Sequence, residues 1–139
     1  MRTTLSTLQK MHDDGEKIAM VTCYDASFAA VLEGVGVDIL LVGDSLGNVV
    51  QGEETTLPVT LDDMIYHTRC VVRGSSTAFI MVDMPFGTSQ ITPEDTFQNA
   101  AELMAAGANM VKIEGGDIML ETVEFLTRRG VPVLSLIHI

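Results

Sequence analysis

The stretch Ile39-Leu40-Leu41-Val42-Gly43-Asp44 is a short apolar run that ends in a carboxylate. Two later stretches repeat the pattern, Ala78-Phe79-Ile80-Met81-Val82 before Asp83 and Asn109-Met110-Val111-Lys112-Ile113 before Glu114. Short runs rich in Val and Ile are typical of buried parallel strands. Parallel strands share one direction, so their carboxyl ends meet at one edge and would bring the three carboxylates together. A hard divalent cation is the expected companion of such a cluster.

The rest of the sequence predicts an alternation of strands and helices. The predicted elements are a helix over about 5–12, a strand over 18–22, a helix over 26–32, a strand ending at 44, a loop over 45–56 with an extended piece at 49–50, a helix from 61 to about 73, a strand ending at 83, a helix from 93 to near 107, a strand ending at 114, a helix over 117–129 and a fifth strand from 131. The helix starts follow capping signals, such as Thr60 with Asp63 and Thr92 before Pro93.

This order fits either a doubly wound open sheet or a (β/α)₈ TIM barrel. The acids favour the barrel, because its consecutive strands are neighbours and their carboxyl ends line one mouth. A barrel needs about 250 residues, whereas this chain has 139. We therefore predict an α/β fold that is about the first half of a barrel.

Composition excludes several kinds of partner. The formal net charge is −11 with only eight basic residues, which argues against nucleic acid and against an anionic membrane surface. No apolar run approaches the roughly 20 residues of a membrane span. The two cysteines form no C-x-x-C pair, which is typical of free thiols in a reducing compartment. The sequence thus predicts a cytoplasmic protein with no membrane partner.

The last six residues, 134–139, follow the start of the fifth strand without turn chemistry. The same six residues are encoded by a transposon adapter that is common in sequencing. We hypothesise that residues 1–133 are the N-terminal half of a single barrel domain and that 134–139 are a non-native, adapter-encoded tail. His138 accordingly receives no functional role.

The segment Gly43-Asp44-Ser45-Leu46-Gly47 is an ambiguous motif. It matches the G-x-S-x-G elbow of α/β-hydrolases and the Gly-Asp-Ser-Leu block of a second group of serine esterases. A serine hydrolase also needs a histidine, and neither His12 nor His67 lies at an expected place in the chain. A tight glycine turn at a strand end is a commoner explanation of such a segment than either hydrolase motif. A serine esterase based on Ser45 is kept as an alternative.

Lys112 and Glu114 lie on one face of their strand, because side chains alternate with a period of two. Burying either charge costs several kcal/mol unless it is paired. The pair is therefore either a structural ion pair or part of a site. Asp83, taken alone, is better explained as a turn-forming residue before Met84-Pro85.

Several blocks in chain order resemble the ketopantoate hydroxymethyltransferase family. The blocks are Val42-Gly43-Asp44-Ser45-Leu46-Gly47, Gln51-Gly52, Thr56-Leu57-Pro58-Val59-Thr60, Tyr66-His67-Thr68, Asp83-Met84-Pro85-Phe86, Ala106-Gly107-Ala108-Asn109-Met110-Val111-Lys112-Ile113-Glu114-Gly115-Gly116 and Val131-Pro132-Val133. They extend over nearly all of residues 5–133, so the resemblance outweighs the five-residue hydrolase match.

The resemblance implies a (β/α)₈ barrel of the phosphoenolpyruvate/pyruvate-binding type. It implies transfer of a hydroxymethyl group from 5,10-methylenetetrahydrofolate to 3-methyl-2-oxobutanoate, giving 2-dehydropantoate for pantothenate and coenzyme A synthesis through a Mg²⁺-stabilised enolate. The family's magnesium ligands correspond to Asp44, Asp83 and Glu114. Its contacts to the keto acid correspond to Asp44, Ser45, Asp83 and Lys112. Bacterial members of the family are typically homodecamers.

Two departures limit what the resemblance implies. The family has Gly-His a few residues after its Val-Pro-Val, where this chain has Ser135 and Leu136. The family's general base is a glutamate that would lie beyond Val133, so we expect no catalytic residue within the chain and no turnover by it. The alternatives are the serine esterase, a Mg²⁺-dependent C–C lyase or mutase of the same superfamily, and an inactive fragment with a residual cation site.

Overall fold

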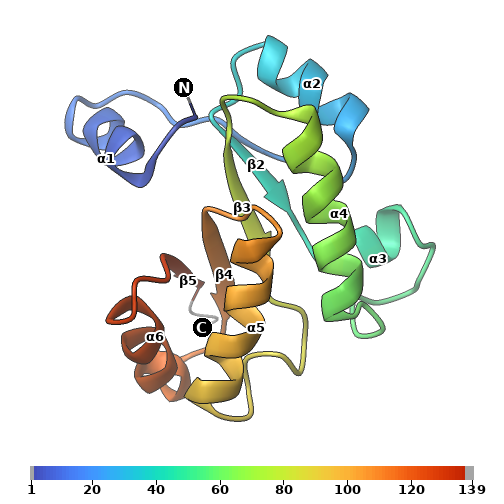
Figure 1. The fold of residues 1–139 in the computed structure, drawn as a ribbon, viewed down its shortest axis with the longest axis vertical. Coiled ribbons are helices and arrows are strands. Elements are labelled where there is room, and N and C mark those ends of the chain that lie inside the picture. The colour runs from blue at the N-terminus through green and yellow to red at the C-terminus, as the bar shows by residue number, and fades with distance from the viewer. Residues whose placement is uncertain (1, 137–139) are drawn as a thin grey trace.

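A single parallel sheet organises the computed structural model, which describes residues 2–136 (Figure 1). Its strand order is β1-β2-β3-β4-β5. The strands are β1 (Met20–Thr22), β2 (Ile39–Val42), β3 (Phe79–Asp83), β4 (Met110–Glu114) and β5 (Val133–Leu136). Because each strand pairs in parallel with the next strand in sequence, the order never reverses as it does in a doubly wound sheet. The prediction of barrel order over the open doubly wound alternative is therefore confirmed.

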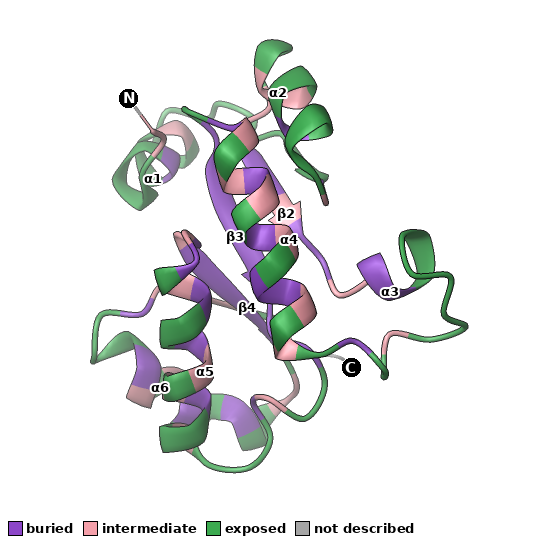
Figure 2. Cartoon of the chain, turned by 45° about the vertical axis from the view of Figure 1, so that its right-hand side comes forward, coloured by how far each residue is buried: buried purple, intermediate pink, exposed green. Residues whose placement is uncertain are grey.

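Helices follow the strands and cover the sheet (Figure 1). They are α1 (Leu5–Asp13), α2 (Ala26–Gly34), α3 (Leu46–Val49), α4 (Leu61–Gly74), α5 (Pro93–Ala105) and α6 (Leu120–Thr127), the last preceded by a 3₁₀ turn at Asp117–Met119. Successive helices α2, α4, α5 and α6 contact one another in that order. Figure 2 shows the buried parts of α4 and α5 against strands β3 and β4, with exposed residues on the outer side of these helices.

The two faces of the sheet have separate apolar clusters because side chains alternate along each strand. Ile80 and Val82 belong to the larger cluster, which the helices share. Phe79 and Met81 belong to the smaller cluster, which also contains Leu8 of α1. Asp83 lies on the same face of the sheet as Phe79 and Met81, because it is two residues further along the strand than Met81. Helix α1 covers this face only at the other end of the strands.

The helix caps predicted from sequence are confirmed. The Thr60 side chain accepts a hydrogen bond from Asp63 N, and the Asp63 carboxylate accepts one from Thr60 N. Thr92 likewise caps α5, with Pro93 at its first turn. These signals act over three residues, so they are independent of the rest of the fold.

Four local predictions differ from the structure, one of them being the fifth strand, which begins at Val133 instead of residue 131. The extended piece expected at 49–50 is wrong, because Val49 N donates to Ser45 O and Val50 N to Leu46 O, which winds this segment into α3. The buried side chain of Leu46 holds the turn against the core. The first strand begins at Met20 instead of residue 18, and the last helix begins as the 3₁₀ turn and ends at Thr127.

The fifth strand extends into the segment that we assigned to an adapter. Glu114 is in register with Leu136, so residues 134–136 pair with β4. Residues 137–139, including His138, lie outside the described residues, and the proposed origin of the tail stays a prediction. Within residues 2–136, the helices are all too short or too polar to cross a bilayer.

Glu33, near the end of α2, holds the loop that precedes β3. Its carboxylate accepts hydrogen bonds from the backbone N–H groups of Ser76, Thr77 and Ala78 at 2.8–3.1 Å. It also accepts one from the Ser75 hydroxyl at 2.5 Å. Burial alone would raise the pKa of Glu33, but these hydrogen bonds lower it to about 2 from an ordinary value of 4.5.

The variant Glu33→Gln is expected to lower the free energy of unfolding by about 1.5–3 kcal/mol at pH 7, because hydrogen bonds to a charged acceptor are lost. The pKa of Glu33 is lower in the folded than in the unfolded chain. The stability that the ionised Glu33 carboxylate contributes is therefore fully present at pH values above its pKa in the unfolded chain. This contribution is lost as the pH falls towards 2, the pKa in the folded chain. Urea unfolding between pH 7 and pH 3 measures the difference, with the exposed Glu102→Gln as the control. A difference between wild type and Glu33→Gln that does not shrink on acidification would contradict this account.

Candidate functional site

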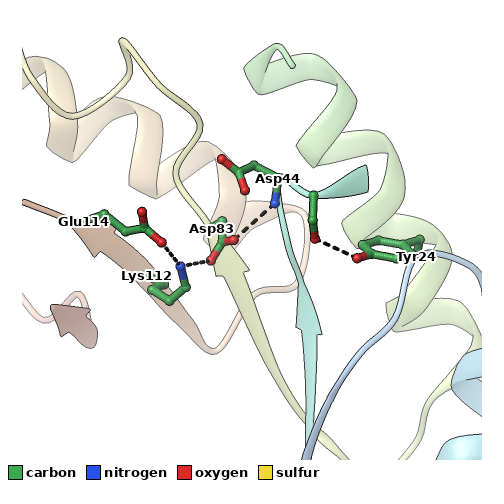
Figure 3. A network of polar contacts seen from close by, with 6 residues as sticks. Tyr24, Asp44, Asp83, Lys112 and Glu114 are labelled. Atoms are coloured by element: carbon green, nitrogen blue, oxygen red, sulfur yellow. Dashed lines mark hydrogen bonds and ion pairs between the residues drawn. The ribbon is translucent and has the colours of Figure 1, made fainter. Parts of the chain in front are cut away.

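The carboxyl ends of β2, β3 and β4 bring four of the predicted site residues to one cavity of about 130 Å³. Asp44, Asp83, Lys112 and Glu114 line it, and the rest of the wall comes from Thr56, Met84, Phe86 and Gln90. Figure 3 shows the four charged side chains at adjacent strand ends. The predicted convergence of these residues at one edge of the sheet is confirmed.

Lys112 lies between two of the carboxylates (Figure 3). Its Nζ is 3.0 Å from Asp83 Oδ1 and 2.6 Å from Glu114 Oε1. Asp83 and Lys112 are direct partners in the β3–β4 register. The Lys112 and Asp83 side chains are each 9% exposed, whereas that of Glu114 is 52% exposed. The positive group among these carboxylates is therefore the lysine ammonium, and the predicted shared face of Lys112 and Glu114 is confirmed.

Burial and neighbouring charges shift the pKa values of Asp83 and Lys112 in opposite directions. Burial raises the pKa of Asp83, and this effect outweighs the attraction of the Lys112 ammonium. Burial would lower the pKa of Lys112, but the hydrogen bond to Glu114 and the charge of Asp83 raise it overall. Lys112 therefore stays positively charged at neutral pH and presents a cation to the cavity.

Gly43 allows the strand ends to approach closely. A Cβ atom on this residue would lie 2.9 Å from Ser45 Oγ and 3.4 Å from Asp83 Oδ2. Asp83 Oδ2 also accepts a hydrogen bond of 3.1 Å from the backbone N–H of Asp44. The glycine of the Gly-Asp-Ser-Leu motif is thus explained by the tight turn that places Asp44 and Ser45 beside Asp83.

Ser45 follows Asp44 but is not one of the residues that line the cavity. Its Oγ lies 2.7 Å from the hydroxyl of Tyr24. Tyr24 follows β1, and its backbone carbonyl lies 2.7 Å from Nδ1 of His67 on α4. Sequence reasoning missed Tyr24, although it follows a strand end just as Asp44 does. His67 contacts a backbone group, as a structural histidine does.

The contacts of Ser45 do not resemble those of a serine hydrolase. Within residues 2–136 the hydrogen-bond partner of Ser45 Oγ is a tyrosine, and His67 bonds to the backbone of that tyrosine. His12 belongs to α1, which packs at the opposite end of the sheet. The described residues thus supply no histidine base to Ser45.

The donor atoms around the cavity suit a hard cation. Carboxylate oxygens are the protein ligands that Mg²⁺ prefers. Asp83 Oδ1 is buried and accepts no aligned hydrogen bond within the described residues, its contact with Lys112 being an ion pair. Residues 2–136 contain no group of three or more His, Cys, Asp or Glu side chains already arranged to hold a metal ion. The oxygen donors are thus of the type that Mg²⁺ prefers. In residues 2–136, however, the three carboxylates are not arranged as a metal site, and Lys112 stands between two of them.

Solved structures with the same fold are larger than this chain. A phosphonopyruvate hydrolase, solved in complex with oxalate and Mg²⁺, matches with a TM-score of 0.78 at 10% identity, covering 97% of this chain and 53% of that one. A phosphoenolpyruvate phosphomutase from Streptomyces platensis subsp. rosaceus matches with a TM-score of 0.78 at 13% identity, covering 97% and 54%. These barrels of the phosphoenolpyruvate mutase/isocitrate lyase superfamily confirm the predicted fold class.

Sequence relatives identify the family. The 3-methyl-2-oxobutanoate hydroxymethyltransferase of Nitrosospira multiformis is 81% identical over 135 residues, which are 97% of this chain and 51% of the relative. That of Nitrosomonas europaea is 69% identical over 134 residues, 96% and 50% respectively. The chain thus spans about half the length of these relatives. The model of the ketopantoate hydroxymethyltransferase family matches residues 2–139. This chain belongs to the ketopantoate hydroxymethyltransferase family.

Proposed function

We propose that this chain carries the metal-binding and keto-acid-binding part of a hydroxymethyltransferase. The reaction moves a hydroxymethyl group from 5,10-methylenetetrahydrofolate to 3-methyl-2-oxobutanoate and gives 2-dehydropantoate. The observation that carries the proposal is the convergence of Asp44, Asp83, Lys112 and Glu114 on one cavity at the strand ends. The names of the relatives support the reaction, because the chain shares 81% of its residues with one of them over the matched length.

Each side chain has a role that follows from its position. The Lys112 ammonium is held by two carboxylates and offers a fixed positive charge to the carboxylate of a 2-oxo acid. The Ser45 hydroxyl can orient the same ligand by a hydrogen bond. Asp44, Asp83 and Glu114 would hold Mg²⁺, which when bound supplies a Lewis acid for the keto oxygen. We assign no described residue to removal of the proton from C3 of the substrate.

A Mg²⁺-dependent C–C lyase or mutase is the second candidate within this fold. A 2,3-dimethylmalate lyase matches with a TM-score of 0.69 at 18% identity, and a phosphomutase matches as well. At these identities the match concerns the fold alone. The transferase is preferred because the relatives at 69% and 81% identity have that name.

Calorimetric titration with MgCl₂ tests the metal part of the proposal. The unaltered chain is expected to bind Mg²⁺. The variants Asp44→Asn and Glu114→Gln are each expected to weaken binding roughly tenfold or more, because each removes a charged ligand. The matched control is Asp62→Asn, which removes an exposed carboxylate from the first turn of α4.

The outcome separates the candidate functions. Equal Mg²⁺ affinity in the wild type, Asp44→Asn and Glu114→Gln, or no binding by any of them, would refute the metal assignment. Covalent labelling of Ser45 by a fluorophosphonate probe would favour the serine esterase instead, since that chemistry needs an activated serine and no metal.

A further inference from the structure

The hydrogen bond between Tyr24 and Ser45 joins the ends of two neighbouring strands. Tyr24 follows β1 and Ser45 follows β2, and these strands pair in parallel up to Thr22 and Leu41. The hydroxyl oxygens are 2.7 Å apart, and either of them could be the donor. Figure 3 shows the Tyr24 hydroxyl pointing towards the strand end that carries Asp44. The contact therefore links the first strand to the substrate-binding edge of the sheet.

The Ser45 side chain is confined by its surroundings. Its backbone is helical, at φ −55° and ψ −12°, yet its hydroxyl does not cap α3. On one side Oγ lies against Gly43, where a Cβ atom would come within 2.9 Å. On the other side it meets the Tyr24 hydroxyl. The hydroxyl is thus free of the usual capping role and is positioned by these two neighbours.

Tyr24 is itself held in place from several directions. Its carbonyl oxygen lies 2.7 Å from His67 Nδ1 on α4, and its ring is partly buried against the main apolar cluster. The preceding residue, Cys23, donates its backbone N–H to Leu41 O, and the following residue, Asp25, caps α2. The phenol oxygen is therefore presented by a rigid support, as a group that orients a binding residue must be.

The chemistry of the two hydroxyls favours one direction of donation. Each hydroxyl has one hydrogen to donate and two lone pairs to accept with. A phenol is a stronger acid than an aliphatic alcohol, so the Tyr24 hydrogen is the better one to place in the shared bond. The Ser45 hydrogen is then left to point at another acceptor, and the acceptor expected beside the Lys112 ammonium is an anionic oxygen of a ligand.

We propose that Tyr24 is a positioning residue, whose hydroxyl donates to Ser45 Oγ and thereby commits the Ser45 hydrogen to an oxygen of the bound 2-oxo acid. This inference rests on the proposed function, because it takes Ser45 to contact that ligand. It differs from direct recognition by Tyr24, since Tyr24 acts only through Ser45. The effects of removing the two hydroxyls should therefore not add.

A double-mutant cycle in ligand binding tests this dependence. The full 139-residue chain is titrated with 3-methyl-2-oxobutanoate at saturating MgCl₂, as wild type, Tyr24→Phe, Ser45→Ala and the double variant. Tyr24→Phe and Ser45→Ala are each expected to weaken binding about fivefold, the effect of one hydrogen bond. The double variant is expected to bind no more weakly than Ser45→Ala. Tyr66→Phe is the matched control, because it removes the hydroxyl of a tyrosine that is 64% exposed, and it should bind as the wild type does.

A spectroscopic measurement separates positioning from a merely structural role. The chain has two tyrosines, so labelling with 3-fluorotyrosine gives two ¹⁹F signals, which the Tyr66→Phe variant assigns. Saturation with the keto acid is expected to shift the Tyr24 signal in the wild type and to leave it unshifted in Ser45→Ala. This measurement keeps Tyr24 intact, so it does not depend on the folding of Tyr24→Phe.

The remaining outcomes show whether the Tyr24 inference fails alone or together with the proposed function. Wild-type affinity in Tyr24→Phe, additive losses in the double variant, or a Tyr24 signal that still shifts in Ser45→Ala would overturn the inference and leave the proposed function standing. No binding of the keto acid by the unaltered chain would overturn the proposed function and this inference with it.

Discussion

Replacing Lys112 with methionine is expected to lower the free energy of unfolding by about 3–5 kcal/mol, because it leaves a buried carboxylate without its cation. The side chains of Asp83 and Lys112 are each 9% exposed, so water is a poor substitute for the ammonium. Methionine keeps a similar unbranched stem, which limits any loss of packing. Urea unfolding followed by circular dichroism in metal-free buffer measures the change.

Two further variants separate the charge from the packing at this position. The double variant Asp83→Asn/Lys112→Met removes both charges of the buried pair and is expected to recover most of the lost stability. Glu114→Gln is expected to cost at most about 1 kcal/mol, because the Glu114 side chain is 52% exposed and its charge is solvated. A double variant as unstable as Lys112→Met would show that the stranded Asp83 charge is not the cause.

Replacing Gly74 with alanine is expected to cost about 3 kcal/mol, the upper part of the range for overpacked sites. A Cβ atom on Gly74, the last residue of α4, would lie 2.2 Å from the carbonyl oxygen of Ala26 and 2.6 Å from its Cα. These are backbone atoms of the first turn of α2, so no side-chain rotation can relieve the overlap. The two helices must separate, and thermal unfolding should show a clearly lower midpoint.

Gly34→Ala provides the matched control in the neighbouring helix. A Cβ atom on Gly34 would meet nothing within 4 Å. Alanine also favours the helical conformation by up to about 1 kcal/mol over glycine. Gly34→Ala should therefore be as stable as the wild type or slightly more stable. Equal stability of Gly74→Ala and Gly34→Ala would contradict the close α2–α4 packing.

Much of the fold could be predicted from the sequence because the signals are local. The strands at 39–42, 79–83 and 110–114 follow from short apolar runs, and the caps at Thr60 and Thr92 follow from bonds across three residues. The helix α3 was missed because its four residues have little helical pattern of their own. It forms where Leu46 is drawn into the core behind the Gly43 turn.

For the candidate site, too, local sequence patterns predicted some residues and missed others. Strand direction and the two-residue alternation of side chains were enough to place Asp44, Asp83, Lys112 and Glu114 at one edge, and the structure confirms this. Tyr24 could have been included by the same rule, since it also follows a strand. It was missed because the pattern used was an apolar run that ends in a carboxylate, and tyrosine has no charge.

By itself the sequence determined the order of strands and the edge at which the charged residues gather, because both depend on short-range patterns and chain direction. Only the tertiary structure decided that Lys112 lies between Asp83 and Glu114, and that Tyr24 bonds to Ser45. Those contacts depend on the register between neighbouring strands and on side-chain rotamers. Both are set by packing among residues that are far apart in the chain.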